Sequence, residues 1–254
     1  KVHRLGLPNH AEHGRLAQIQ DYFQQKMERG MQMAVKAVLW DLDGTIADSA
    51  ALHYQAWQSI MGRYAIHYTH QMFVDAFGRN NAEILTELFD TADAATIQRI
   101  SHEKEADFRA LLTPGALEPL PGVLDWLTSF GQQGLPQVIG SSGPMANIAA
   151  MVHALGIGDY FLALVTGAHL PKGKPDPTLF RRCAAVAGVE PADCLVIEDS
   201  IHGIDAAQRA GMRSIAVGAL ANSDGLRTLL AVENAAFCLA LPSLAQVDAL
   251  SCLL

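Results

Sequence analysis

The sequence KAVLWDLDGTIAD at residues 36–48 begins as an apolar run and ends in acidic side chains. The apolar residues 37–40 predict a short strand that is buried on both faces. Asp41 and Asp43 follow two positions apart, so their side chains point to the same side of an extended backbone. Gly44 then permits a sharp turn. Because carboxylates beside a buried strand are costly unless something offsets their charge, we expect a divalent cation there.

The composition excludes several classes of protein. The chain has 254 residues, of which 50% are hydrophobic and 17% charged, which is typical of a globular protein with one or two domains. The net charge of −8 argues against a nucleic-acid partner. The four cysteines form no CxxC pair and predict reduced, mostly buried thiols. Neither a signal peptide nor a membrane span is expected, so a cytoplasmic protein is predicted.

An all-helical block directly follows the first predicted strand. The predicted helices are 49–62, 69–76, 81–89, 93–98 and 99–111, with Ser49 as the N-cap of the first. Residues 1–33 differ in composition and are read as an N-terminal extension. The predicted division is an α/β core at 34–47 and 119–245, a helical cap at 48–118, and a tail at 246–254.

Strands and helices alternate in the second half of the chain. The predicted strands are 137–140, 162–166, 195–197, 214–217 and 236–239. Helices of about ten residues between them favour a parallel sheet covered on both faces. The predicted fold is therefore α/β, with a three-layer Rossmann-like core and an inserted all-helical domain.

Polar side chains stand at four places where the predicted strands end. They are Asp41 with Asp43, Ser141, Lys174 in the loop 167–177, and Glu198 with Asp199. Ligands of open parallel sheets bind at this edge, so the fold would bring these groups together. Each also has an ordinary interpretation: Asp41 and Asp43 as a common pair of acids after a strand, Ser141 as a helix N-cap, Lys174 as a solvated loop lysine, and Glu198 with Asp199 as surface acids at a helix start. Together they suit phosphoryl transfer, which needs a nucleophile, an acid, and cations.

These motifs resemble those of the haloacid dehalogenase superfamily. The matching segments are DLDGT at 41–45, Ser141, KPDP from Lys174, and EDS at 198–200 with the following GIDAAQRAGM. The helical block after the first motif is similar to the cap of the β-phosphoglucomutase-like subfamily.

The resemblance implies roles for the core residues. Asp41 is expected to be the nucleophile and a Mg²⁺ ligand, and Asp43 the general acid and base whose backbone carbonyl also binds Mg²⁺. Ser141 and Lys174 would hold the phosphoryl group. Glu198 and Asp199 would complete the metal site, and Thr45 and Ser142 would add contacts. Asp43 argues against the dehalogenases and the phosphonoacetaldehyde hydrolases of the superfamily, which lack it.

The resemblance also assigns substrate contacts in the cap. His53 resembles the hinge histidine of the mutases, with Trp57 following it, and Lys104 resembles their cap lysine. A surface histidine and a solvated lysine remain the alternatives. The position of the mutases' phosphate-binding arginine falls at Asn81, with Arg79 two residues earlier. Gly143-Pro144-Met145 replaces a polar run of the mutases, so some of the groups that would bind a second phosphate are missing.

The predicted function is a Mg²⁺-dependent phosphomonoesterase. It would act on a small phosphorylated metabolite, a sugar or polyol phosphate, through an aspartyl phosphate. A β-phosphoglucomutase-type mutase and a non-catalytic binding module on the same fold stay open as alternatives. The expected partner is this metabolite, with neither nucleic acid nor membrane, and no oligomeric state is predicted.

Overall fold

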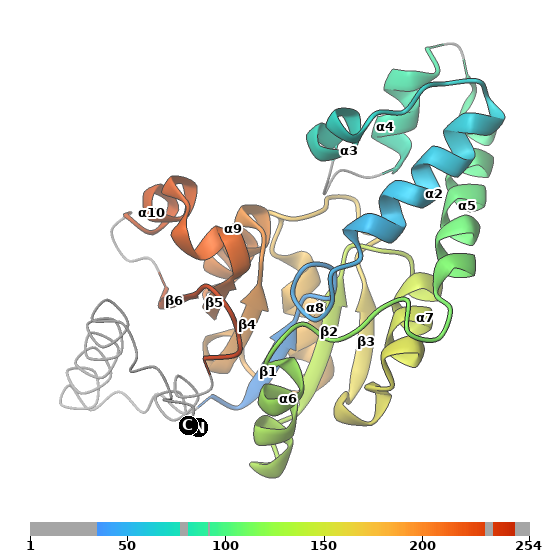
Figure 1. The fold of residues 1–254 in the computed structure, drawn as a ribbon. Coiled ribbons are helices and arrows are strands. Elements are labelled where there is room, and N and C mark those ends of the chain that lie inside the picture. The colour runs from blue at the N-terminus through green and yellow to red at the C-terminus, as the bar shows by residue number, and fades with distance from the viewer. Residues whose placement is uncertain (1–34, 77–80, 91, 232–235, 247–254) are drawn as a thin grey trace, which may run out of the picture.

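Six parallel strands form one sheet at the centre of the chain (Figure 1). The computed structural model describes residues 35–76, 81–90, 92–231 and 236–246. The strand order is β3-β2-β1-β4-β5-β6. The strands are β1 (Ala37–Trp40), β2 (Gln137–Ser141), β3 (Ala163–Thr166), β4 (Cys194–Glu198), β5 (Arg213–Val217) and β6 (Cys238–Leu241). The predicted α/β class with a parallel sheet is confirmed, whereas the predicted extension at 1–33 lies outside the described residues.

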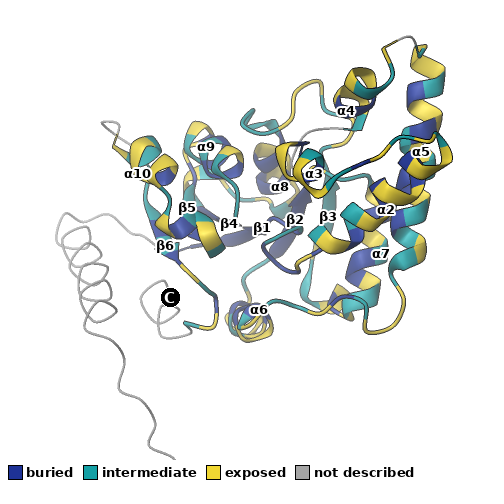
Figure 2. Cartoon of the chain, turned by 45° about the horizontal axis from the view of Figure 1, so that its top comes forward, coloured by how far each residue is buried: buried dark blue, intermediate teal, exposed yellow. Residues whose placement is uncertain are grey.

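Helices cover both faces of the sheet and make it the middle of three layers (Figure 2). On one face, α6 (Val123–Gln132) and α7 (Met145–Leu155) pack against Trp40 and neighbouring residues. On the other, α8 (Thr178–Ala187) and α9 (Ile201–Ala210) pack against Leu39. All four residues of β1 are buried, which explains why its sequence is apolar without alternation.

An all-helical domain is inserted between β1 and α6. Its helices are α2 (Ala50–Arg63), α3 (His70–Ala76), α4 (Asn81–Leu88) and α5 (Ala94–Leu111). They enclose a hydrophobic core of their own, which includes Trp57 and Ile100. The two connecting segments run side by side, because Ala47 pairs with Pro119 and the Leu120 N–H donates to the Ile46 carbonyl at 2.8 Å. The inserted domain is confirmed, and its residue limits stay a prediction.

Some predicted elements were wrong in extent. The segments 93–98 and 99–111 form the single helix α5, because Ile97, Ile100, Lys104 and Phe108 continue one buried face without a breaker. The last strand lies two residues later than predicted, at Cys238–Leu241. The reason is that both backbone groups of Ala236 bond to the side chain of Gln208. The helix α10 (Asp224–Leu230) was not predicted.

Two further predictions concern the thiols and the membrane. Cys183, Cys194 and Cys238 are free, and the first two are buried. Within the described parts of the chain, no helix combines the length and apolarity that a membrane span requires.

Candidate active site

Three neighbouring strands end at the same edge of the sheet and present the predicted groups there. Trp40 of β1 pairs with Ile139 of β2 on one side and with Ile197 of β4 on the other. The next residue, Asp41, donates its N–H to the Ile197 carbonyl at 3.0 Å. Asp41 therefore lies between the ends that carry Ser141 and Glu198. The chain changes direction across the sheet at this point, which is where open α/β sheets bind ligands.

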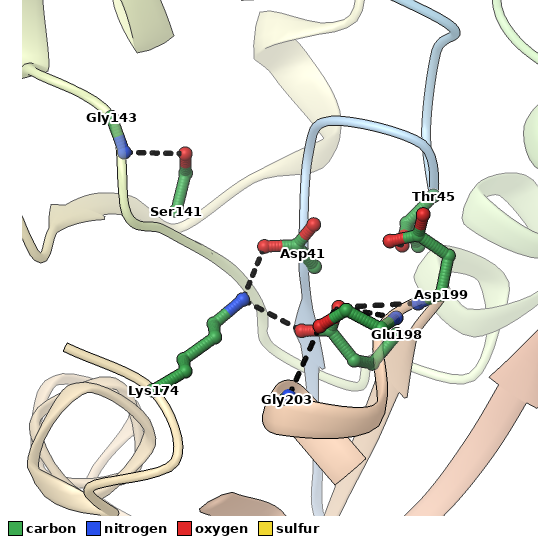
Figure 3. A network of polar contacts seen from close by, with 9 residues as sticks. Asp41, Thr45, Ser141, Gly143, Lys174, Glu198, Asp199 and Gly203 are labelled. Atoms are coloured by element: carbon green, nitrogen blue, oxygen red, sulfur yellow. Dashed lines mark hydrogen bonds and ion pairs between the residues drawn. The ribbon is translucent and has the colours of Figure 1, made fainter. Parts of the chain in front are cut away.

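Lys174 joins the two carboxylates beside it (Figure 3). Its Nζ lies 2.5 Å from Asp41 Oδ1 and 2.6 Å from Glu198 Oε2. The ammonium also lies 5.1 Å from the ring centroid of the buried Phe180. Burial lowers the pKa of Lys174, but the two carboxylates outweigh it and hold that pKa above its usual value. Lys174 is thus a buried, charged group and not a solvated loop lysine.

Asp41, Glu198 and Asp199 form a compact acidic cluster. Ligand oxygens of these three residues all lie within 4.8 Å of one another. Burial and the Glu198 carboxylate raise the pKa of Asp41 well above its usual value, against the effect of Lys174. The same two causes raise the pKa of Asp199 to about 7. Three carboxylates face one ammonium, so the cluster fits a hard divalent cation that prefers oxygen ligands.

Two glycines make room for this cluster. Gly44 has a φ of +79°, and a Cβ on it would lie 2.1 Å from Asp199 Oδ2. A Cβ on Gly203 in α9 would lie 2.0 Å from Glu198 Cδ. Sequence reasoning missed the role of Gly203, although its spacing of five residues from Glu198 is a signal that the sequence carries.

Hydrogen bonds hold the acidic side chains in place. Glu198 Oε1 accepts from the Ser200 hydroxyl at 2.8 Å and from the Ser200 N–H at 3.0 Å. Thr45, which was predicted as an additional contact, donates to Asp199 Oδ1 at 3.1 Å. These hydrogen bonds from Ser200 and Thr45 fix the positions of the Glu198 and Asp199 carboxylates.

Asp43 lies apart from the acidic cluster and has its own partners. Its Oδ1 accepts from the Ser49 hydroxyl and lies 3.5 Å from His53 Nε2. Burial raises the pKa of Asp43, but the bonds from His53 and Ser49 outweigh it and leave that pKa below its usual value. Ser49 stands at the predicted N-cap position of α2, but its side chain makes no capping bond: its backbone is helical (φ −94°, ψ −1°), whereas a capping residue is extended.

His53 and Lys104 extend this set into the helical domain. Lys104 Nζ lies 2.9 Å from His53 Nδ1. Because an ammonium can only donate, Nδ1 accepts, and a neutral His53 carries its proton on Nε2, facing Asp43. Lys104 is 2% exposed, so the alternative of a solvated lysine was wrong. Trp57 is buried too, and its ring centroid lies 5.2 Å from Lys104 Nζ. Trp57 therefore contacts the site through Lys104.

The remaining predicted residues have different surroundings. Ser141 Oγ accepts from the Gly143 N–H at 3.1 Å, and α7 begins only at Met145, so Ser141 does not cap that helix. Ser142 is exposed. Asn81 donates to Glu105 Oε1 at 2.6 Å. Arg79 lies outside the described residues.

Comparison with known proteins identifies the family. Residues 38–217 match the family described as haloacid dehalogenase-like hydrolase. The chain belongs to this family. The predicted resemblance is thereby confirmed, and this hydrolase is an enzyme of the superfamily's phosphatase and mutase branch.

The relatives of this hydrolase include both activities. It is 36% identical over 193 residues to the β-phosphoglucomutase of Bacillus subtilis, covering 72% of this chain and 84% of the relative. It is 32% identical over 182 residues to the fructose-1-phosphate phosphatase YqaB of Escherichia coli, covering 71% and 95%. The crystal structure of β-phosphoglucomutase from Clostridium difficile superposes with a TM-score of 0.71 at 25% identity, covering 85% and 96%. A phosphatase or mutase role is therefore supported.

Proposed function

We propose that this hydrolase is a Mg²⁺-dependent phosphomonoesterase that acts on a small sugar or polyol phosphate through an aspartyl phosphate. The observation that carries the proposal is the arrangement around Asp41. Its carboxylate is bridged to Glu198 by Lys174, while Asp43 stands apart on a separate set of hydrogen bonds. Two aspartates in two different environments suit two different chemical roles.

In this scheme Asp41 is the nucleophile. It attacks phosphorus in line and forms the aspartyl phosphate, and the bond to the ester oxygen breaks. Lys174 offsets the charge of Asp41 and of the phosphoryl oxygens, and Ser141 donates to one of these oxygens. Asp41, Glu198, Asp199 and the Asp43 carbonyl would hold Mg²⁺, which supplies positive charge to the nucleophile and the phosphoryl group.

Asp43 moves the protons of both half-reactions. It gives a proton to the departing alcohol and then takes one from the water that hydrolyses the aspartyl phosphate. Its side chain is 30% exposed, so substrate and water can reach it. The bonds from Ser49 and His53 favour the ionised carboxylate, which is the form that the second half-reaction needs.

The first test removes the nucleophile. Asp41→Asn keeps the shape of the side chain but loses its charge, so Mg²⁺-dependent phosphate release from sugar phosphates should fall by about 10³-fold or more. The matched control is Asp125→Asn on the exposed side of α6, which should keep full activity. Retention of more than a few per cent of activity by Asp41→Asn contradicts the scheme.

Hydrolysis is favoured over mutase activity by the surroundings of Asn81. A mutase must hold a second phosphate while the bisphosphate turns round. Asn81 is uncharged, and its amide donates to Ser101 at 3.1 Å and to Glu105 at 2.6 Å. Gly143, Pro144 and Met145 also offer no charged side chain where β2 leads into α7.

The mutase stays the second candidate, because one relative with 36% identity is named β-phosphoglucomutase. Product analysis separates the candidates: hexose 1-phosphate is supplied with catalytic bisphosphate, and free phosphate and hexose 6-phosphate are both quantified. Free phosphate as the main product supports the hydrolase, and hexose 6-phosphate supports the mutase. No turnover of any phosphoester with Mg²⁺ supports the binding module instead.

A further inference from the structure

Glu105 is a buried carboxylate in α5 that the proposed mechanism does not use. Its side chain is 8% exposed. Oε1 accepts from Lys104 Nζ at 3.0 Å and from the Asn81 amide at 2.6 Å, and Oε2 accepts from the Asn147 amide. A buried carboxylate is costly unless it is paired and bonded, and Glu105 is both. Because both of its oxygens accept hydrogen bonds, Glu105 is expected to hold its neighbours in specific positions.

The bond to Asn147 joins two parts of the fold. Glu105 belongs to the inserted helical domain, whereas Asn147 lies in the first turn of α7, in the core. Asn147 is 4% exposed, and its Oδ1 accepts from Arg109 of α5 at 2.8 Å. Both ends of the Asn147 amide are thus bonded to α5. The pair fixes α5 against the helix that follows the predicted phosphoryl-binding loop at Ser141.

Glu105 is also directly linked to the group beside Asp43. Its Oε1 bonds to the Lys104 ammonium, which donates to His53 Nδ1 at 2.9 Å. The other ring nitrogen of His53 faces Asp43 at 3.5 Å. Burial lowers the pKa of Lys104, and Glu105 is the first of the groups that oppose this. Glu105 therefore supplies both the charge partner and the position of Lys104.

We propose that Glu105 and Asn147 form a latch between the helical domain and the core, and that through Lys104 and His53 this latch positions Asp43 for proton transfer. Glu105 is a positioning residue and touches no reacting atom. The inference rests on the proposed role of Asp43 in phosphate release. Its structural half, the coupling of residues 105 and 147, can be measured without any substrate.

Exchanging the two side chains gives a sharp test. Glu105→Gln places an amide NH₂ against a donor in either orientation, facing the Asn147 amide or, flipped, the Lys104 ammonium and the Asn81 amide. Asn147→Asp sets two carboxylates against each other. The double variant restores a donor facing an acceptor, with the amide now at 105 and the carboxylate at 147 beside Arg109. Glu103→Gln is the matched control, because it removes a carboxylate from the more exposed side of the same helix.

The latch predicts a defined pattern in kcat and KM for phosphate release. Each single variant should lose about tenfold in kcat with KM nearly unchanged, and the double variant should recover part of the loss, because residue 105 regains its bond to residue 147 but not its charge beside Lys104. Glu103→Gln should match the unmodified protein. Single variants with unchanged kcat overturn the positioning role, and so does a double variant no better than the singles.

Urea unfolding of the same proteins keeps the test independent of catalysis. The midpoints of the single variants should fall, and the midpoint of the double variant should exceed the additive expectation. If the unmodified protein releases no phosphate, the proposed function fails, while the unfolding cycle still decides the latch. Additive midpoints overturn the latch itself.

Discussion

At the scale of single residues, Gly203 shows how the site depends on a missing side chain. The nearest atoms to a Cβ at this position belong to Glu198, with Cδ and Oε2 both at 2.0 Å. Glu198 has no free direction to move, because Ser200 and Lys174 already bond to its two oxygens. Displacing Glu198 therefore disturbs Lys174 and, through it, Asp41.

Gly203→Ala should reduce phosphate release by about tenfold or more, because its Cβ overlaps Glu198. Alanine is otherwise the better helix former by about 1 kcal/mol, so the propensity of α9 works in the opposite direction. Steady-state kinetics and urea unfolding measure the two effects separately. Gly62→Ala in α2 is the control: apart from the adjoining backbone of its own helix, no atom lies within 4 Å of its Cβ, and activity should stay unchanged. Activity of Gly203→Ala equal to that of Gly62→Ala contradicts the assigned role of Gly203.

At the scale of elements, two helices that begin after a serine differ in what that serine does. Ser223 accepts from the Leu226 N–H at 3.1 Å and caps α10. Ser49 occupies the same position before α2, yet its hydroxyl is donated to Asp43. The sequence pattern of a serine before a helix does not separate these cases, because the difference lies in the backbone: Ser223 is extended, whereas Ser49 is helical, with a φ of −94° and a ψ of −1°.

Alanine at the two serines should therefore have opposite consequences. Ser223→Ala should cost about 1 kcal/mol of stability and leave phosphate release unchanged. Ser49→Ala should lower kcat by about tenfold with little loss of stability, because Asp43 loses a hydrogen bond. Thermal unfolding measures the stability of each variant, and kcat on one sugar phosphate measures its activity. A large stability loss with unchanged kcat in Ser49→Ala would show that Ser49 acts as a cap after all.

Periodicity predicted most elements within a residue or two, and the exceptions have physical causes. The strands of the sheet centre were found because burial on both faces makes them continuously apolar. β6 lies at the sheet edge with alternating burial, so its short apolar signal left its register open. That register is set by pairing with β5, from Ser214 with Cys238 to Val217 with Leu241, which no local pattern contains.

At the scale of the whole molecule, the sheet order explains why the core site was predictable and the latch was not. Ser141 and Glu198 are the last residues of their strands and Asp41 directly follows β1, so a parallel sheet alone brings them together. Glu105 and Asn147 lie on helices of different domains, and their contact depends on how α5 packs against α7. Contacts between side chains of two packed helices produce no fixed spacing of residues in the sequence. Sequence reasoning therefore gave Glu105 no role.

The charge balance of the site also belongs to the whole molecule. Asp41, Glu198 and Asp199 come from two strands and crowd around one lysine. The raised pKa values of Asp41 and Asp199 mean that folding opposes the ionisation of these two carboxyl groups. The hydrophobic layers on both faces of the sheet stabilise the fold enough to hold this repulsion in place. A bound cation would remove it.

Mg²⁺ should therefore stabilise this hydrolase, by about 2.7 kcal/mol at a concentration a hundredfold above its Kd. Asp199→Asn provides the contrast. It keeps an oxygen for the Thr45 hydroxyl but removes one of the three repelling charges. In chelator the variant should be at least as stable as the unmodified protein. On going from chelator to Mg²⁺, its stability should rise much less than that of the unmodified protein. Thermal unfolding in both buffers measures the difference, with Asp125→Asn as the control that should respond like the unmodified chain. An equal gain in Asp199→Asn would place the cation away from Asp199, because removing the charge of a ligand must weaken the binding of the ion.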